Sequence, residues 1–330
     1  METAAVETFG LAAIEGARTR IAPFIKLTPL ERSHTLSELL GTNIYAKYEL
    51  FQRTGSFKAR GAFNKLLRLT EEQRSKGVVA VSGGNHAQAV AYAARKLGTD
   101  AVILMPESTP KNYVEATRGY GAKIDLQPTI AAAFEKIEKY RSEGRAFVHP
   151  FDDAEVMAGA GTLGLEIVEQ CPELTDVIVS IGGGGLMGGV STAIKAKKPD
   201  ARIWGVETLG ADAMAQALEA GRPVTLDAIT SIAKTLGAPA VSESTLALAQ
   251  KYLESVTVVD DAAAVAALNF IAERLKVITE PAASCTWAAA EILKNNFGPN
   301  SHVVLILCGG NTSLTDVADY NERFAVSDTK

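Results

Sequence analysis

The sequence contains few cysteines, few aromatic residues and no long apolar run. Its three cysteines, Cys171, Cys285 and Cys308, are too few and too widely spaced for a disulfide framework or a paired-cysteine metal site. No apolar run reaches the ~18 residues that a membrane-spanning helix needs. The N-terminus has early glutamates and no basic segment, which argues against a secretory signal. We therefore expect a cytoplasmic protein with no membrane partner.

An excess of positive charge is also missing. The chain carries 33 Lys and Arg against 38 Asp and Glu, which gives a net charge of −5. Nucleic acids and anionic membranes bind clustered Lys and Arg, so neither is expected as a partner. Aromatic residues make up only 6% of the chain, which favours helices packed on a sheet over an aromatic-lined all-β fold.

Apolar runs bounded by glycine alternate with helical patterns along most of the chain. The expected buried strands are 77–82, 100–105, 122–127, 176–181, 201–207 and 302–307. Helical patterns lie between them, for example at 87–98, 131–141 and 263–275. This alternation predicts an α/β fold with mostly parallel sheets flanked by helices. Residues 149–153 separate a first unit from a second sheet, and ligands are expected in the crevice at the carboxyl ends of the strands.

Three glycine-containing loops follow three of these strands, each leading into a helix. They are Ser82–His86, Gly182–Gly189 and Cys308–Asn311. Backbone N–H groups at a helix N-terminus, uncovered by side chains, form an anion site. A tight turn without a ligand explains one such loop well, but it explains three at equivalent positions poorly. The second loop also fits the dinucleotide pattern Gly183-x-Gly185-x-x-Gly188, with Glu207 ending the next strand, so an NAD-dependent oxidoreductase is a rival interpretation.

The segment Ser56-Phe57-Lys58-Ala59-Arg60-Gly61-Ala62 decides between these interpretations. It resembles the lysine signature of fold-type II pyridoxal-phosphate (PLP) enzymes, in the serine/threonine dehydratase branch. The three glycine loops resemble that family's substrate-carboxylate loop, phosphate loop and pyridine-nitrogen loop, and all four motifs occur in family order between residues 49 and 311.

The resemblance implies a tryptophan synthase β-like fold of two open, twisted, mostly parallel sheets. PLP would lie in the cleft between a large domain, 1–54 and 151–330, and a small domain, 55–150. It also implies a homo-oligomer, most simply a dimer. Only about one helix follows Asn311, so the C-terminal regulatory domain of biosynthetic threonine dehydratases is not expected.

The resemblance also assigns roles to individual residues. Lys58 is the catalytic residue that forms the Schiff base. The expected cofactor contacts are Phe57, Lys58, Asn85, Gly182, Gly183, Gly184, Gly185, Leu186 and Cys308. The expected substrate-carboxylate contacts are Ser82, Gly83, Gly84, Asn85 and His86.

Elementary chemistry agrees with two of these roles. A lysine is nucleophilic only as the free amine, and Lys58 begins a helical pattern, where the positive end of the helix dipole disfavours its ammonium form. A neutral Cys308 thiol cannot hold the pyridine nitrogen protonated, which favours elimination over a long-lived carbanion. Without the motif, Lys58 would read as a surface lysine and Cys308 as a small buried residue.

Two positions depart from the serine racemases of this family. Gly83 replaces the serine that protonates the opposite face of the substrate Cα, so racemisation should be poor. Glu207 and Ala211 match two ligands of the family's divalent-cation site, but the second carboxylate position is Ala213. Calcium and magnesium need several oxygen ligands, so this loop favours a monovalent ion such as potassium, unless Asp212 compensates.

The sequence therefore predicts a PLP-dependent ammonia-lyase that acts on a β-hydroxy-α-amino acid. L-Threonine would give 2-oxobutyrate and L-serine would give pyruvate, each with ammonia. The same chemistry on phenylserine or 3-hydroxyaspartate is the nearest alternative. A serine racemase, a β-replacement synthase, an NAD-dependent oxidoreductase and a non-catalytic amino-acid sensor are more distant ones.

Overall fold

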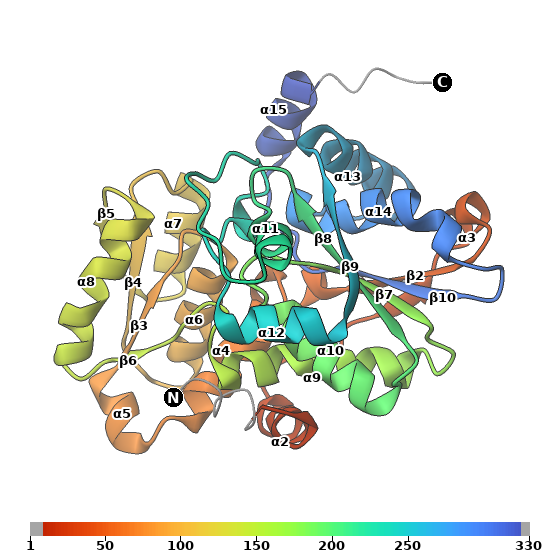
Figure 1. The fold of residues 1–330 in the computed structure, drawn as a ribbon. Coiled ribbons are helices and arrows are strands. Elements are labelled where there is room, and N and C mark those ends of the chain that lie inside the picture. Colours follow the sequence, from red (N-terminus) through yellow and green to blue (C-terminus); the bar gives the residue numbers. More distant parts are fainter. Residues whose placement is uncertain (1–8, 325–330) are drawn as a thin grey trace.

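The computed structural model describes residues 9–324 and contains two separate sheets (Figure 1). The six-stranded sheet has the order β1-β2-β10-β7-β8-β9, and the four-stranded sheet has the order β5-β4-β3-β6. All pairs are parallel except β1 with β2. The chain leaves the large sheet after β2, builds the small sheet, and returns at β7.

The strands are short and mostly buried. Their bounds are β1 Leu30–Arg32, β2 Asn43–Tyr48, β3 Val78–Val81, β4 Ala101–Pro106, β5 Lys123–Gln127, β6 Ala146–Phe147, β7 Asp176–Ser180, β8 Arg202–Thr208, β9 Leu253–Val259 and β10 His302–Leu307. All six strands expected from the sequence are present, but the expectation that each is buried is wrong for β5, which lies at the edge of the small sheet and is partly exposed. Four strands were not predicted: β1, β2, β6 and β9.

Helices surround both sheets. Their bounds are α2 Leu11–Ile21, α3 His34–Leu40, α4 Lys58–Arg68, α5 Glu71–Lys76, α6 Asn85–Lys96, α7 Lys111–Gly119, α8 Ile130–Ser142, α9 Ala154–Gln170, α10 Gly185–Lys197, α11 Ala213–Ala220, α12 Glu243–Tyr252, α13 Asp261–Leu275, α14 Pro281–Leu293 and α15 Leu314–Phe324. Four 3₁₀ turns are Glu49–Phe51, Arg53–Gly55, Lys234–Leu236 and Lys294–Asn296.

Strand β10 shows why its apolar run is continuous. Val303, Leu305 and Leu307 pack into the core under α13 and α14, whereas Val304 and Ile306 pack into the core over α9 and α10. Successive side chains of a strand point to opposite faces, so a strand covered on both faces must be apolar throughout. The small sheet follows the same rule: Val78 of β3 faces α4 and α6, and Val79 faces α8.

Helices α4, α9 and α10 pack against one another at glycines. A Cβ at Gly159 of α9 would lie 2.4 Å from the Arg60 carbonyl oxygen of α4, and a Cβ at Gly189 of α10 would lie 2.4 Å from the Met157 carbonyl oxygen of α9. Real Cβ atoms do not approach that closely, so these glycines set the helix spacing. Because α4 begins at Lys58, this packing fixes the position of the Lys58 backbone.

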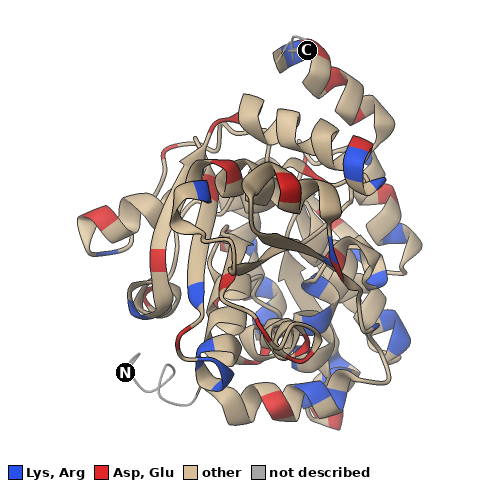
Figure 2. Cartoon of the chain, turned by 90° about the vertical axis from the view of Figure 1, so that its right-hand side faces the viewer, with Lys and Arg blue, Asp and Glu red and all other residues tan. Residues whose placement is uncertain are grey.

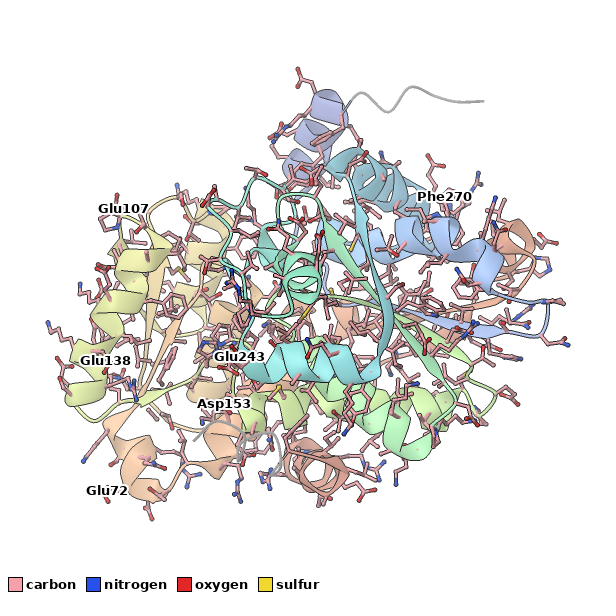
Figure 3. All side chains as sticks on the ribbon, in the orientation of Figure 1. Glu72, Glu107, Glu138, Asp153, Glu243 and Phe270 are labelled. Atoms are coloured by element: carbon pink, nitrogen blue, oxygen red, sulfur yellow. The ribbon has the colours of Figure 1, made fainter. Side chains whose placement is uncertain are left out.

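Charged side chains lie on the outside of both halves. Glu72, Glu107 and Glu138 project from the small-sheet half into solvent (Figure 3). Basic and acidic residues both occur on the outer helices (Figure 2). Within residues 9–324, no helix is both long and apolar enough to cross a membrane.

Candidate active site

The lysine motif and two of the three glycine loops meet at the carboxyl ends of β3 and β10. The Phe57 N–H donates to the Cys308 carbonyl at 3.0 Å, and Ser56 forms a β-bridge with Gly309. The Asn311 amide donates to Asn85 Oδ1 at 2.7 Å. The structure therefore brings together Lys58, the loop after β3 and the loop after β10, and we call this region the crevice.

Lys58 is the first residue of α4 and is half-buried. Its Nζ donates to the Pro150 carbonyl at 2.7 Å and lies 5.2 Å from the centre of the Phe57 ring. Burial lowers the pKa of Lys58 to about 8, against the opposing effects of Cys308 and Glu280. Burial thus supplies the pKa depression that a nucleophilic lysine needs.

A left-handed turn precedes Lys58. Thr54 and Gly55 have φ values of 61° and 72°. A Cβ at Gly55 would lie 2.4 Å from Asn311 Oδ1, and the Asn311 amide donates to the Thr54 carbonyl at 2.8 Å. The turn therefore needs glycine at its second position, and Asn311 holds it in place.

The sequence did not indicate Glu280, which lies at the centre of this crevice. Asn85 Nδ2 donates to Glu280 Oε1 at 2.7 Å, and Glu280 Oε2 has no hydrogen-bond partner among the described residues. A Cβ at Gly309 would lie 2.4 Å from Glu280 Oε1, so the first glycine of the Cys308–Asn311 loop makes room for this acid. Burial raises the pKa of Glu280 to about 7. The Glu-Pro pair that begins α14 is the local signal that could have directed attention to it.

Tyr113 is a second residue that the sequence did not indicate. It lies on α7 beside the small sheet, and its hydroxyl donates to the Asn311 carbonyl across the crevice. Burial raises the pKa of this phenol above its usual range. Tyr113, Asn311, Asn85 and Glu280 thus form one hydrogen-bonded chain that connects the two halves of the protein.

The tetraglycine loop leads from β7 into α10. Gly184 has a φ of +92° at the N-cap of α10, and no side chain caps that helix. Uncapped N–H groups at a helix N-terminus bind anions, phosphate included. Phe151 packs against this loop, since a Cβ at Gly183 would lie 2.2 Å from its ring. Leu186, in the first turn of α10, is buried.

The remaining predicted residues lie on the loop after β3. Ser82 Oγ accepts from the Gly84 N–H at 3.1 Å, and α6 begins at Asn85. His86 Nε2 is 2.9 Å from the Val148 carbonyl oxygen, and burial together with Lys58 lowers the pKa of His86 to about 3. A neutral, hydrogen-bonded His86 fits a structural role better than that of a general base.

Cys308 is buried at the end of β10. Its Sγ lies 3.6 Å from the Ala282 carbonyl oxygen, and burial raises the pKa of the thiol well above its usual range. The side chain is therefore a neutral thiol, in agreement with the chemistry expected for this position.

The predicted cation loop is folded around Glu207. Both Glu207 carboxylate oxygens accept backbone N–H bonds, at 2.9 Å from Met214 and 2.8 Å from Ala215. Ala211 follows in a turn closed by a bridge between Thr208 and Ala211. Burial raises the pKa of Glu207 to about 8. Glu207 thus anchors the start of α11, and a bound cation stays a prediction.

Unpartnered polar atoms gather at the same crevice. Eight buried side-chain atoms of the described residues have no hydrogen-bond partner. Those near Lys58 and the loops after β3 and β10 belong to Thr54, Ser56, His86, Thr109, Glu280 and Thr312. Buried polar groups without partners are costly, and their concentration beside a low-pKa lysine and an uncapped helix fits a polar, phosphorylated cofactor.

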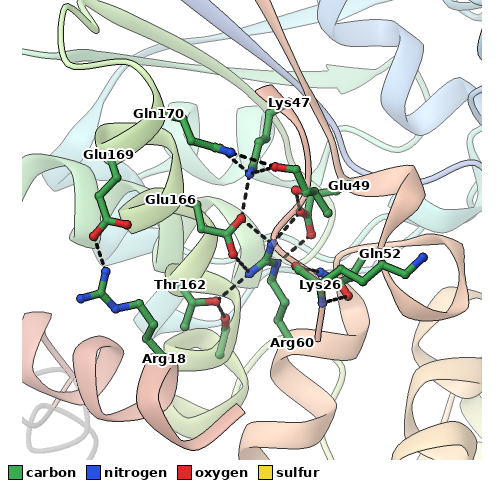
Figure 4. Close-up of polar contacts among 12 residues, drawn as sticks. Arg18, Lys26, Lys47, Glu49, Gln52, Arg60, Thr162, Glu166, Glu169 and Gln170 are labelled. Carbon is green, nitrogen blue, oxygen red and sulfur yellow. Dashed lines mark hydrogen bonds and ion pairs between the residues drawn. The ribbon is translucent and has the colours of Figure 1, made fainter. Parts of the chain in front are cut away.

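A network of buried ion pairs surrounds Arg60, two residues after Lys58 (Figure 4). Arg60, on α4, pairs with Glu49 at 2.8 Å and with Glu166 at 2.6 Å. Lys47 pairs with Glu166 at 2.7 Å. These residues join β2, α4 and α9, so the network holds the helix that begins at Lys58.

Comparison with known proteins identifies the family. The family described as "Pyridoxal-phosphate dependent enzyme" matches residues 21–309. The chain belongs to this family. Its curated relatives include phenylserine dehydratase of Ralstonia pickettii, 41% identical over 93% of this chain and 95% of the relative. L-threonine ammonia-lyase of Thermotoga maritima is 38% identical over 91% of this chain and 75% of the relative.

The fold has a close match among solved structures. Maize serine racemase superposes with a TM-score of 0.90 at 36% identity, covering 96% of this chain and 98% of the other. The fold-type II architecture expected from the sequence is therefore confirmed. PLP fits the crevice described above: Lys58 would bind it covalently and the N-terminus of α10 would hold its phosphate. The NAD-dependent interpretation of the tetraglycine loop is set aside.

Proposed function

We propose that this protein is a PLP-dependent ammonia-lyase that eliminates water from L-threonine and L-serine. The observation that carries the proposal is Lys58, a half-buried lysine with a pKa of about 8 at the meeting point of the lysine motif and the loops after β3 and β10. The products are a 2-oxo acid and ammonia. Water is lost and then added back, so one amino acid gives one molecule of each.

The residues of this chain would have the following roles in the reaction. When bound, PLP withdraws electrons from the substrate Cα and makes its C–H bond acidic. Lys58 Nζ removes that proton as general base. The loop Ser82–His86 would hold the substrate carboxylate with its backbone N–H groups. The side-chain amide of Asn85, whose Nδ2 donates to Glu280, would orient the cofactor ring. The neutral Cys308 thiol leaves the pyridine nitrogen without a charged partner.

The same chemistry on phenylserine is the second candidate. The 41% identity to a phenylserine dehydratase favours it. A racemase is disfavoured, although maize serine racemase shares the fold. Gly83 offers no hydroxyl to the opposite face of Cα, and a Cβ at Gly83 would lie 2.6 Å from Thr109 Oγ1. The space at this position of the loop therefore suits glycine and leaves little room for a larger residue.

Further properties belong to the same proposal. The large domain comprises 1–54 and 151–330, and the small domain comprises 55–150; the active chain is a cytoplasmic homodimer. Potassium binds at Glu207 and Ala211 and orders the loop that follows β8. Potassium is supported by the cation-loop motif of the family, of which this chain retains the first carboxylate, Glu207, and lacks the second.

Substrate assays separate the candidates. Purified protein with PLP is given L-threonine, L-serine, phenylserine and 3-hydroxyaspartate, and ammonia and 2-oxo acid are quantified together. The proposal expects equal amounts of both products and the highest kcat/KM with L-threonine or L-serine. A higher kcat/KM for phenylserine would support the second candidate. Ammonia release absent with all four substrates would contradict the proposed reaction.

A further inference from the structure

A group of metal-ligating side chains lies at the opposite end of the large sheet from the crevice. One potential ligand atom each from Cys171, Glu173 and His302 lies within 4.8 Å of the other two. His302 is the first residue of the six-residue strand β10, whereas Cys308 follows its last residue. At ~3.3 Å per residue, the group is roughly 20 Å from the crevice.

The backbone holds these three residues firmly. Cys171 is the C-cap residue of α9, and its carbonyl accepts the Leu174 N–H at 3.0 Å, which closes the turn that carries Glu173. The His302 N–H donates to Thr175 Oγ1 at 2.8 Å, and its carbonyl accepts the Thr175 N–H at 3.0 Å. The turn after α9 and the start of β10 are thus fixed against each other.

A tyrosine orients the histidine ring. Tyr45 Oη and His302 Nδ1 are hydrogen-bonded at 3.1 Å, and the two rings stack with their centres 5.8 Å apart. Metal-bound histidines usually have such a partner on the second ring nitrogen, which fixes the ring and its tautomer. With Nδ1 bonded to Tyr45, Nε2 is the ring nitrogen of His302 for which the described residues provide no hydrogen-bond partner.

The chemistry of the three side chains selects the ion. A thiolate, an imidazole and a carboxylate suit zinc, which binds sulfur at ~2.3 Å and nitrogen or oxygen at ~2.0–2.2 Å in a tetrahedron. Such a tetrahedron needs ligand atoms ~3.5 Å apart, so the present group must contract by roughly 1 Å. The exposed Glu173 side chain can supply that movement, while Cys171 forms the buried base of the site.

We propose that Cys171, Glu173 and His302 bind one zinc ion, with water as the fourth ligand. The ion would connect the end of α9 to β10 and stabilise the sheet without touching the crevice.

Cobalt is the direct probe of this site. The PLP-loaded protein is freed of metals with a chelator, dialysed, and titrated with Co²⁺ and then with Zn²⁺. The proposal expects one equivalent of Co²⁺ with a thiolate charge-transfer band, displacement of that band by Zn²⁺, a higher Tm with Zn²⁺ and unchanged ammonia-lyase activity. No saturable binding of one equivalent, or binding without a thiolate band, would overturn it.

Four variants locate the ion. Cys171→Ala should abolish the charge-transfer band, and Cys285→Ala, which changes a buried cysteine outside the group, should retain it. Glu173→Gln alters an exposed side chain and should fold normally, yet weaken binding at least ~10-fold, while Tyr45→Phe should weaken it by about 10-fold. A band that persists in Cys171→Ala, or unchanged affinity in Glu173→Gln, would place the ion elsewhere.

Discussion

Two lysines, the buried Lys47 and the half-buried Lys58, differ in what surrounds them. Lys47 donates to the Thr28 carbonyl at 2.8 Å and to Glu166 and Gln170 at 2.7 Å each. Lys58 donates to one carbonyl, that of Pro150. Lys47 has a carboxylate partner and completes its hydrogen bonds within the protein, whereas Lys58 has neither and keeps its amine available for chemistry.

Their neighbourhoods differ in the same way. Within the ion network of Figure 4, burial lowers the pKa of Lys47 despite its pairing with Glu166, yet Glu49 and Glu166 together raise the pKa of Arg60 above its usual range. In the crevice, burial dominates and leaves Lys58 and Glu280 with pKa values of about 8 and about 7. The paired charges of the network therefore stabilise the fold, whereas the crevice holds groups that can exchange protons near neutral pH.

Removing Lys58 should have the largest effect on catalysis. Lys58→Ala should lower kcat by at least ~10³-fold, because one residue carries both the covalent link and the Cα proton transfer, and proton transfer alone contributes ~10²–10⁴-fold. The circular dichroism spectrum and Tm should stay close to those of the parent protein. Most of the ammonia release surviving in this variant would contradict the assignment.

The matched change in the ion network should affect stability instead. Glu166→Gln removes the carboxylate charge that pairs with both Arg60 and Lys47. Breaking a buried ion pair lowers the free energy of unfolding by about 3–5 kcal/mol. Urea unfolding should show that loss, while kcat of the folded fraction falls far less than in Lys58→Ala. A kcat loss equal to that of Lys58→Ala, with unchanged unfolding free energy, would remove the distinction between the two regions.

The pH dependence of cofactor uptake sharpens the comparison. Lys58 reacts as the free amine, and its pKa is about 8, so PLP uptake by the cofactor-free protein should accelerate as pH rises through about 8 and then level off. Stopped-flow absorbance measures this rate. An uptake rate that levels off only near pH 10, the range of an ordinary lysine, would show that burial does not control this amine.

Glu280 should make stability depend on pH in the opposite direction from a paired carboxylate. Its folded pKa of about 7 exceeds the ordinary value of 4.5. Its contribution is therefore fully present below pH 4.5 and is lost as pH rises through 7. In the cofactor-free protein, Glu280→Gln should flatten the decline of Tm over this range. An equally steep decline in the variant would assign it to other groups, such as Glu207.

The racemisation fraction should be small and should depend on packing at Gly83. With L-serine, pyruvate should exceed D-serine by chiral chromatography. Gly83→Ser alone should change this little, because its Cβ meets Thr109 Oγ1 at 2.6 Å. Gly83→Ser combined with Thr109→Ala should raise the D-serine fraction. D-serine formed faster than pyruvate by the parent protein would refute the single-base account.

Ions should have the smallest effect. Potassium or ammonium should support higher activity than sodium or lithium, and EDTA should leave activity unchanged. Glu207→Ala should lower stability and PLP affinity, since Glu207 also holds the start of α11. Activity lost to EDTA and restored by magnesium would point to Asp212 as an additional ligand.

The sequence predicted strands that are buried on both faces and loops that carry glycine. It missed β2 and β9, whose runs are partly polar, as in Asn43–Tyr48 with its buried Lys47. The sequence identified Lys58 and the glycine loops because each belongs to a short motif of neighbouring residues. It missed Glu280 and Tyr113, because their importance arises from contacts with Asn85 and Asn311 across the crevice. The Glu-Pro pair that begins α14 marks a helix start, but it does not encode the contact of Glu280 with Asn85.

Trapping the cofactor tests the central claim most directly. The PLP-loaded protein should absorb near ~410–420 nm, as expected of a lysine-bound cofactor, and borohydride should abolish that band. Digestion and mass spectrometry should then find one pyridoxyl group, on the peptide that contains Lys58, and none on the peptide that contains Lys47. A modified peptide other than that of Lys58, or no modified peptide, would contradict the account.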